Sequence, residues 1–425
     1  MKKYLEKLPK EILDLIYLAR DIANSGNMPV YLVGGFVRDL LLGVKNLDLD
    51  IVVEGDGIKF AEDFAGRLKA KLTRHRRFGT ATILFSRPHL KIDIASSRKE
   101  FYPQPGHLPL VTRGILKDDL FRRDFTINAM AISISYGNFG ELMDLFGGKA
   151  DLENKKVRVL HNFSFRDDPT RILRAARFEK RYNFSIEPGT LKLIKEAARL
   201  KMLENVEPQR IRDELILTLK EEHPIKEIRR LQDLGALSFI SPHAALSKRT
   251  YRLLRSIERQ VSWFERELRQ RRILDRWLMY FIGLTDFLAI RDLKSICNKF
   301  AFRKGEEKRI LGYKKINHRF ISVLNKKEIR PSRIFALLEP LSYEVILLLK
   351  AKYKNPPLQE HIERFFKEYN GMRIHISGHD LHNLGIAPSP DYQKIFKKIL
   401  NAKLNGLVTT KEEEMALLRK VVRMK

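Results

Sequence analysis

Two aspartates in this sequence, Asp48 and Asp50, have the spacing of a metal site. They lie two residues apart and precede the β-branched run 51–53, so on a strand both carboxylates would face the same way. Two carboxylates on one face repel each other unless a cation lies between them, and hard oxygen ligands suit Mg²⁺. An Asp-x-Asp pair alone is more often a solvated strand edge, so the metal site depends on its neighbours.

The residues just upstream favour the metal site because they predict a phosphate cradle. The apolar run 31–33 predicts a strand, Gly34 and Gly35 a turn, and the residues after them a helix. Glycines let the backbone approach a phosphate, and a helix N-terminus offers it unpaired N–H groups. Arg38, one turn into the helix, can add a bidentate contact. This stretch therefore indicates a metal-dependent nucleotide site, in which one or two Mg²⁺ hold a triphosphate and lower the pKa of an attacking hydroxyl.

A third carboxylate, Asp93, lies in a predicted hairpin of strands 80–85 and 90–94, with a turn around Arg87 and Pro88. Asp93 is either a further acid beside the metal or an outward-facing residue of an edge strand. The stretch 98–109 that follows is rich in proline and glycine and predicts an irregular loop. Loops of this length in compact domains are often functional.

A second group of polar residues has the types needed to hold a triphosphate and a ribose. Arg122 and Arg123 supply cationic forks, and Asp124 can fix one of them or accept a hydrogen bond from a ribose hydroxyl. Asn128 adds a neutral hydrogen-bonding group. An Arg-Arg-Asp triplet alone is usually a surface ion-pair patch, so its meaning depends on the longer run that contains it.

A third group lies on a predicted helix with Pro169 in its first turn. Arg171, Arg174 and Arg177 recur every three residues and form a cationic stripe, which is most often a solvated face. Asp168 lies three residues before Arg171, so an acceptor and a donor can together meet the edge of a base. An aspartate can accept from the exocyclic amino group of C or A, and an arginine can donate to ring acceptors.

These groups, in this order, resemble the signatures of polymerase-β-like nucleotidyltransferases, in the branch of bacterial tRNA nucleotidyltransferases and poly(A) polymerases. The run 119–131, Asp-Leu-Phe-Arg-Arg-Asp-Phe-Thr-Ile-Asn-Ala-Met-Ala, resembles the second motif of class II tRNA nucleotidyltransferases almost residue for residue. In that family these arginines hold triphosphate and ribose. Similar enzymes also have a mobile segment near 98–109, so we expect that loop to close over the growing 3′ end.

The run 167–171, Asp-Asp-Pro-Thr-Arg, is similar to the family's nucleotide-selecting motif Glu-Asp-x-x-Arg, whose side chains mimic a template. The first acid here is Asp rather than Glu. Proline and threonine fill the middle in some members that add only A, but proline is also found there in enzymes that add both bases. The choice among CCA, CC and A alone therefore stays open.

The whole chain carries a net charge of +29, from Lys+Arg 81 against Asp+Glu 52, which indicates a polyanionic partner and nucleic acid first. No apolar run of about 18 residues predicts a membrane span. A single cysteine, Cys297, excludes internal disulfides and a cysteine metal site. We therefore expect a cytoplasmic protein with no membrane partner. The oligomeric state is not predicted.

The predicted fold class is α+β, with a polymerase-β-like head of mixed sheet and helices followed by helical segments. The expected domains are a catalytic head at 1–148, a neck with the nucleotide-selecting helices at 149–220, and a helical body and tail that bind tRNA at 221–345 and 346–425.

Three further segments lie outside the head. In the neck, Arg210 and Glu214 resemble the family's next motif and are expected to hold helices together. The basic, aromatic stretch 248–277 either tracks an RNA backbone or forms a solvated face over buried aromatics. The histidine-rich stretch 371–390 resembles a structural element of the family's tail rather than a metal site.

The resemblance implies a template-independent tRNA nucleotidyltransferase that adds the 3′-terminal CCA, or its terminal A, from CTP or ATP and releases pyrophosphate. Two Mg²⁺ on Asp48 and Asp50, with Asp93 as a third catalytic acid, would activate the tRNA 3′-hydroxyl and stabilise the leaving group. The expected nucleotide-binding residues are Gly34, Gly35, Arg38, Arg122, Arg123, Asp124, Asp168, Arg171, Arg174 and Arg177. The alternatives are a poly(A) polymerase and a non-catalytic RNA-binding protein on a decayed nucleotidyltransferase scaffold.

Overall fold

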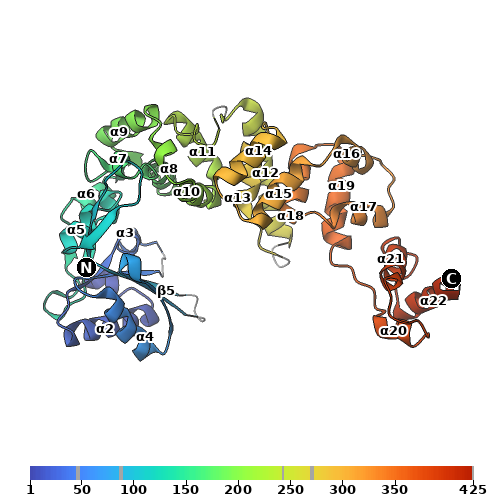
Figure 1. Ribbon diagram of the computed structural model, residues 1–425, viewed down its shortest axis with the longest axis horizontal. Coiled ribbons are helices and arrows are strands. Elements are labelled where there is room, and N and C mark those ends of the chain that lie inside the picture. Colours follow the sequence, from blue (N-terminus) through green and yellow to red (C-terminus); the bar gives the residue numbers. More distant parts are fainter. Residues whose placement is uncertain (45–47, 86–89, 242–243, 269–271, 424–425) are drawn as a thin grey trace. The chain divides into compact units, whose positions relative to one another are not determined.

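The computed structural model of the protein describes residues 1–425 except 45–47, 86–89, 242–243, 269–271 and 424–425 (Figure 1). The chain divides into two compact units, a first unit at 1–242 and a second unit at 243–425. The first unit contains a mixed sheet with helices, and the described part of the second unit is helical. The predicted α+β class is therefore confirmed. The predicted boundaries at 148 and 220 both fall inside the first unit and, like the boundary at 345, stay predictions.

The central sheet of the first unit has seven strands in the order β3-β4-β5-β2-β1-β8-β9. Neighbouring strands are antiparallel except β2 and β5, which are parallel. This parallel pairing sets Asp50 opposite Asp93. The strands are β1 (Val30–Val33), β2 (Leu49–Val53), β3 (Lys71–His75), β4 (Thr80–Leu84), β5 (Lys91–Ser96), β8 (Ala131–Ser133) and β9 (Leu142–Met143).

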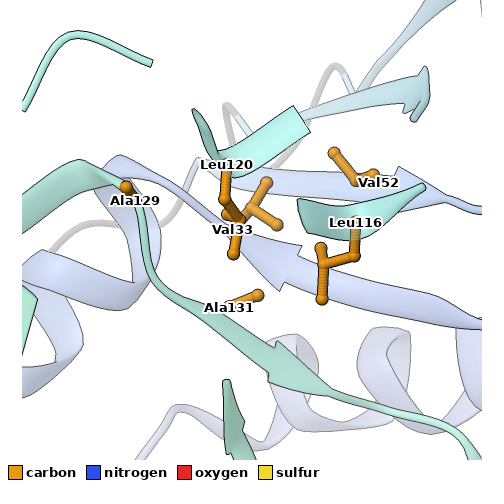
Figure 2. Packing of buried hydrophobic residues seen from close by; sticks show 6 residues of the cluster. All are labelled: Val33, Val52, Leu116, Leu120, Ala129 and Ala131. Atoms are coloured by element: carbon orange, nitrogen blue, oxygen red, sulfur yellow. The ribbon is translucent and has the colours of Figure 1, made fainter. Parts of the chain in front are cut away.

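The two faces of this sheet have different partners because alternate residues of a strand point to opposite sides. On one side lie α2 (Lys10–Ser25) and α4 (Gly57–Leu68), which contact each other, and α4 also contacts β4 and β5 (Figure 1). On the other side, Figure 2 shows Leu116 and Leu120 of α5 (Leu116–Phe121) packed over Val33 and Val52. Asp50 shares the Val52 side of β2, so its carboxylate lies on the face that α5 covers.

The predicted strand, glycine turn and helix are confirmed. β1 leads through Gly34 into α3 (Gly35–Leu42), and Gly34 has φ +67°, a backbone conformation that favours glycine. The short α1 (Lys2–Leu5) precedes these elements.

The prediction of an irregular loop over 98–109 was wrong in part. β6 (Arg98–Phe101) pairs with β7 (Leu110–Arg113) in a two-stranded antiparallel sheet, and 102–109 connects them. Both strands have only four residues, and three of the four in β6 are charged, so neither strand carries a clear apolar alternation that the sequence pattern could reveal. The predicted β4–β5 hairpin is confirmed by its pairing, whereas its turn at Arg87 and Pro88 lies outside the described residues.

Among the helices that follow the central sheet, α8 contacts α7, α10 and α11. The predicted helix begins later than expected, because Pro169 lies two residues before α8 and Asp168 has an extended backbone. Two short strands, β10 (Lys156–Val157) and β11 (Ser185–Ile186), pair in parallel. The helices are α6 (Gly148–Glu153), α7 (Ser164–Asp167), α8 (Arg171–Arg181), α9 (Pro188–Arg199), α10 (Pro208–Lys220) and α11 (Pro224–Asp233).

The second unit packs α12 against α13 and α18. Its last helices have a core of their own, which includes Ile376, Leu381 and Leu418. None of the described helices has the length and apolarity that a membrane span requires. The helices are α12 (Lys248–Leu268), α13 (Arg276–Leu284), α14 (Ile290–Lys299), α15 (Lys304–Lys314), α16 (His318–Leu324), α17 (Pro331–Leu338), α18 (Tyr343–Lys352), α19 (Pro356–Arg364), α20 (Gly378–His382), α21 (Asp391–Leu404) and α22 (Lys411–Arg423).

The histidine-rich stretch of the tail is built into this core. Ile376 and Leu381 are buried, and Asp380 accepts hydrogen bonds from the backbone and hydroxyl of Ser377 at the start of α20. His375 lies 3.2 Å from the buried carboxylate of Glu414. These contacts hold the segment against α22.

Candidate active site

A cavity of about 520 Å³ in the first unit brings together most of the predicted site residues. The β6–β7 hairpin supplies further lining through Arg98, Glu100 and Tyr102. Four predicted residues do not line this cavity, namely Gly34, Asp48, Asp93 and Arg177. Those that do are Gly35, Arg38, Asp50, Arg122, Arg123, Asp124, Asp168, Arg171 and Arg174.

Asp50 and Asp93 lie at paired positions of β2 and β5, and both line a smaller cavity of about 310 Å³ that shares Asp50, Arg122 and Arg123 with the larger one. β5 lies between β4 and β2, so Asp93 is not on an edge strand. Asp93 accepts a hydrogen bond from Thr82 at 2.7 Å and pairs with Lys91.

The donor set fits a hard cation. Burial raises the pKa of Asp50 to about 6, Arg123 opposes this shift, and the charges of Asp93 and Asp48 add to it. A carboxylate that is desolvated beside other carboxylates is stabilised when a cation binds, and oxygen donors of this kind suit Mg²⁺. Asp48 lies just before β2 and is exposed. Within the described ranges, no group of three or more His, Cys, Asp or Glu residues is already placed to hold a metal ion.

The two adjacent arginines are held by Asp119, a residue that the sequence analysis did not single out. Its buried carboxylate lies 2.7 Å from Arg122 and 3.0 Å from Arg123. Burial favours the protonated form, but the two arginines prevail and lower the pKa of Asp119. A Cβ at Gly34 would lie 2.5 Å from Arg123 Nη1, so any other residue here would displace the end of the arginine, and φ of +67° also favours glycine. The i,i+3 and i,i+4 spacing on a helix is a signal that could have revealed Asp119.

Asp124 belongs to a separate buried network. Its carboxylate accepts hydrogen bonds from Arg174 at 2.8 Å and from Asn128 at 2.9 Å. Although burial opposes ionisation, Arg174 and Asn128 lower the pKa of Asp124 to about 2. Asn128 accepts in turn from Arg38 at 2.6 Å, and Arg38 pairs with Asp39 at 2.7 Å. The network therefore ties α3 to α8 through three charged side chains and the neutral amide of Asn128.

The arginine stripe of α8 faces protein rather than solvent. Glu214 of α10 lies 2.9 Å from Arg174 and 3.0 Å from Arg177, and Glu221 lies 3.8 Å from Arg177. Arg174 and Arg177 therefore have carboxylate partners of their own, and Glu214 ties α8 to α10.

Asp168 and Arg171 lie together in the wall of the larger cavity. Arg171 donates to Ser164 Oγ at 2.6 Å and to the backbone oxygen of Arg122 at 2.7 Å. Asp168 lies 2.8 Å from Arg210, which also lines the cavity. Arg210 was expected only to hold helices together, and the sequence offered no signal for this contact with a residue 42 positions earlier.

Two family models match parts of this chain. The poly A polymerase head domain matches residues 30–158, and the probable RNA and SrmB-binding site of polymerase A matches residues 183–247.

Curated relatives match nearly the whole chain. The A-adding tRNA nucleotidyltransferase of Halalkalibacterium halodurans is 31% identical over 420 residues, which cover 97% of this chain and 93% of that protein. The A-adding tRNA nucleotidyltransferase of Geobacter sulfurreducens is 39% identical over 410 residues, which cover 95% of this chain. The chain spans only 46% of the length of that second relative.

Solved structures match over the whole chain as well. A CCA-adding enzyme in apo form II has a TM-score of 0.77 at 35% identity, with 100% of this chain and 98% of that chain covered. The Thermotoga maritima CCA-adding enzyme complexed with tRNA has a TM-score of 0.72 at 34% identity, with 99% and 98% covered. A CCA-adding enzyme in complex with ATP has a TM-score of 0.74 at 34% identity, with 100% and 98% covered.

Proposed function

Because the chain belongs to the family of bacterial tRNA nucleotidyltransferases, as its match to the Halalkalibacterium enzyme over nearly the full length of both chains shows, we propose that it adds a nucleotide to the 3′ end of tRNA. The donor is ATP or CTP, and pyrophosphate is released. The A-adding relatives and the Asp-Asp-Pro-Thr-Arg sequence at 167–171 favour addition of the terminal A. The observation that carries the proposal is the single cavity shared by Asp50, the Arg122–Arg123 pair and the Asp168–Arg171 pair.

The family is in general metal-dependent, and we propose Mg²⁺ on Asp48 and Asp50, with Asp93 beside them. When bound, Mg²⁺ supplies charge neutralisation at the triphosphate and lowers the pKa of the attacking 3′-hydroxyl. The protein contributes arginines that are already oriented. Asp119 fixes Arg122 and Arg123 in place, so their remaining donors can bind phosphate oxygens with little loss of side-chain entropy.

Base selection is assigned to Asp168 and Arg171 on the same cavity wall. A carboxylate accepts from the exocyclic amino group of A or C, and a guanidinium donates to ring acceptors. Both side chains already have protein partners that limit their rotation. A protein site that reads the base in this way needs no nucleic-acid template.

Binding of the tRNA body is assigned to the basic face of the second unit. A cavity of about 760 Å³ there is lined by four arginines and two lysines, with Asp286 as its acidic member. Tyr251 and Tyr353 also line this cavity. Two other aromatics of α12 do not, since Phe264 is fully buried and Lys350 covers the Trp263 ring at 3.6 Å. The basic residues are Arg249, Arg252, Arg255, Arg259, Lys352 and Lys354. A tRNA substrate also implies the cytoplasm as the place of action.

The test incubates the protein and Mg²⁺ with tRNAs that end at the discriminator base, at C, or at CC, with ATP and CTP given separately and together. We expect one A on the CC-ended tRNA from ATP alone. Incorporation of C onto the bare discriminator would show a CCA-adding enzyme instead. Long A tails on an unstructured RNA would show a poly(A) polymerase, and tRNA binding without any transfer would show a decayed scaffold.

A further inference from the structure

One arginine connects the proposed base-reading residue to the β6–β7 hairpin. Arg210, near the start of α10, lies 2.8 Å from Asp168 through Nη2 and donates through Nη1 to the backbone oxygen of Gly106 at 3.2 Å. Both contacts use one planar guanidinium, so they fix the distance between a carboxylate of the neck and the backbone of the 102–109 connection.

The Asp168 carboxylate is oriented through both of its oxygens. Oδ1 accepts from the backbone N–H of Thr170 at 3.1 Å and from its hydroxyl at 2.6 Å, and Oδ2 pairs with Arg210. A carboxylate oxygen has about two lone-pair sites, so Thr170 occupies both sites of Oδ1, whereas Oδ2 can accept one hydrogen bond besides that of Arg210. These contacts therefore leave Oδ2 as the oxygen with which Asp168 meets a base. Without Arg210, Oδ2 would lose its only partner among the described residues.

The 102–109 connection is docked on the same neck elements. The N–H of Gly106 donates to the backbone oxygen of Arg166 at 3.1 Å. A Cβ at Gly106 would lie 3.1 Å from the backbone oxygen of Asn205 and 3.3 Å from Val206, and φ of +75° also favours glycine there. The connection therefore approaches the neck closely at the residue that Arg210 contacts.

The same hairpin reaches the proposed triphosphate arginines at its other end. Glu100 on β6 lies 3.1 Å from Arg122 and also pairs with Arg98 at 2.8 Å. The hydroxyl of Tyr102 donates to Glu100 at 2.8 Å. One hairpin thus contacts a proposed phosphate-binding residue through Glu100 and, through Arg210, the proposed base-reading carboxylate.

We propose that Arg210 is a positioning residue for base selection, which orients Asp168 toward the incoming base and ties that carboxylate to the hairpin that lines the cavity. This inference rests on the proposed function. Arg210 acts through Asp168 and does not touch the reacting atoms. A residue that merely joined helices would, when removed, lower stability and slow transfer of A and C alike, whereas a positioning residue changes the preference between them.

The test compares Arg210→Ala and Arg210→Lys with the control Arg212→Ala, whose side chain pairs with Asp213 on the same helix. Transfer of A and of C onto CC-ended tRNA is measured with Mg²⁺, together with melting temperature and KM for tRNA. For Arg210→Ala we expect the ratio of kcat/KM for ATP to that for CTP to fall about tenfold, the effect of removing one charged hydrogen bond. KM for tRNA should not change. Arg210→Lys should restore part of the ratio, because an ammonium can pair with Asp168 but lacks the planar fork.

A double-mutant cycle with Asp168→Asn tests whether Arg210 affects base selection through Asp168. If Arg210 acts through Asp168, adding Arg210→Lys to Asp168→Asn changes the preference between ATP and CTP no further. The inference is overturned if Arg210→Ala keeps the wild-type ratio, if the cycle is additive, or if Arg212→Ala shifts the ratio equally. If Arg210→Ala does not fold, Arg210→Lys and the double-mutant cycle still test whether Arg210 is a positioning residue. If the wild type transfers nothing, the proposed function fails, and the ratio of ATP to CTP bound at equilibrium still tests Arg210.

Discussion

Asp124 and Arg174 lie 2.7 Å apart and form an ion pair between the segment after α5 and helix α8. The same pairing raises the pKa of Arg174, despite burial, and Arg174 also binds Glu214. Asp124 and Arg174, which were both expected to bind nucleotide, thus bind each other. Their ion pair joins the sheet-containing part of the first unit to its helices.

Removing Arg174 should destabilise the first unit. Arg174→Ala leaves the Asp124 carboxylate buried without its cation, which costs about 3–5 kcal/mol for a broken buried pair. Urea unfolding of Arg174→Ala and of wild type measures this loss in the free energy of unfolding. Arg181→Ala at the exposed end of the same helix is the control and should cost less than about 1 kcal/mol. Equal stability of the two variants would contradict a structural role for the pair.

The same pair predicts a pH dependence. The pKa of Asp124 is lowered from 3.8 to about 2 in the folded protein, so its contribution to stability is fully present above pH 4 and is lost as pH falls from about 4 to about 2. We expect Asp124→Asn to remove part of the acid sensitivity of wild type in that range. A parallel loss of stability in both proteins would show that other carboxylates dominate acid unfolding.

Local structure around the site was predictable from the sequence because short-range rules determine it. The run 31–33 and Gly34 predicted β1 and the turn into α3. Alternation predicted that Asp48 and Asp50 share one face of a strand, and of these two residues Asp50 lies within β2 whereas Asp48 lies just before it. The parallel pairing that sets Asp50 opposite Asp93 could not be predicted in this way, because the sequence of neither strand indicates which strand it pairs with. Hairpin partners follow from a short connection, whereas parallel partners depend on packing of the whole sheet.

The partners of the α8 arginines also could not be predicted from the sequence pattern. A period of three residues predicted a shared face for Arg171, Arg174 and Arg177 but not what that face meets. Glu214 lies 40 residues after Arg174, and Asp124 lies 50 residues before it. The interpretation as a solvated stripe is wrong because Arg174 and Arg177 pair with carboxylates of and next to α10, and Arg171 donates to Ser164 and Arg122. Periodicity along one helix does not show which other elements pack against it.

The proposed metal site makes a direct prediction about catalysis. Asp48→Ala and Asp50→Ala should each abolish transfer, to below about a hundredth of wild type, because each removes an oxygen ligand for Mg²⁺. Binding of tRNA, measured by filter retention, should persist because the basic surface holds the RNA. Asp63→Ala, an exposed carboxylate on α4, is the control and should transfer normally. Substantial transfer by either site variant would remove that residue from the metal site.

The basic cavity of the second unit predicts a strong salt dependence. Binding of tRNA should release counterions from several phosphates, so log K should fall linearly with log salt. Replacing Arg249, Arg252 and Arg259 together by Ala should weaken binding and reduce that slope by about 1 for each phosphate that is no longer neutralised. Arg74→Ala, which removes an exposed arginine paired with Glu62 in the first unit, is the control. An unchanged slope in the triple variant would place the RNA elsewhere.

A buried carboxylate outside the site predicts a stabilising substitution. Burial raises the pKa of Glu227 on α11 from 4.5 to about 7, and the charge of Glu221 adds to the shift. Its Oε2 has no hydrogen-bond partner within the described ranges. Because the folded state binds the proton more tightly, wild type loses stability as pH rises from about 4.5 to about 7. Glu227→Gln carries no charge to desolvate, so at pH 8 it should be more stable than wild type by about 1–3 kcal/mol.

The gain from Glu227→Gln should disappear below pH 4.5, where Glu227 is protonated in both the folded and the unfolded chain. Urea unfolding of both proteins at pH 4.5, 6 and 8 measures this dependence. Glu196→Gln removes a charge from an exposed position of α9 and should leave stability nearly unchanged at every pH, which separates burial from net charge. If the gain for Glu227→Gln were constant with pH, the amide would stabilise α11 by packing or hydrogen bonding. Ionisation of Glu227 would then not be what destabilises the wild-type protein.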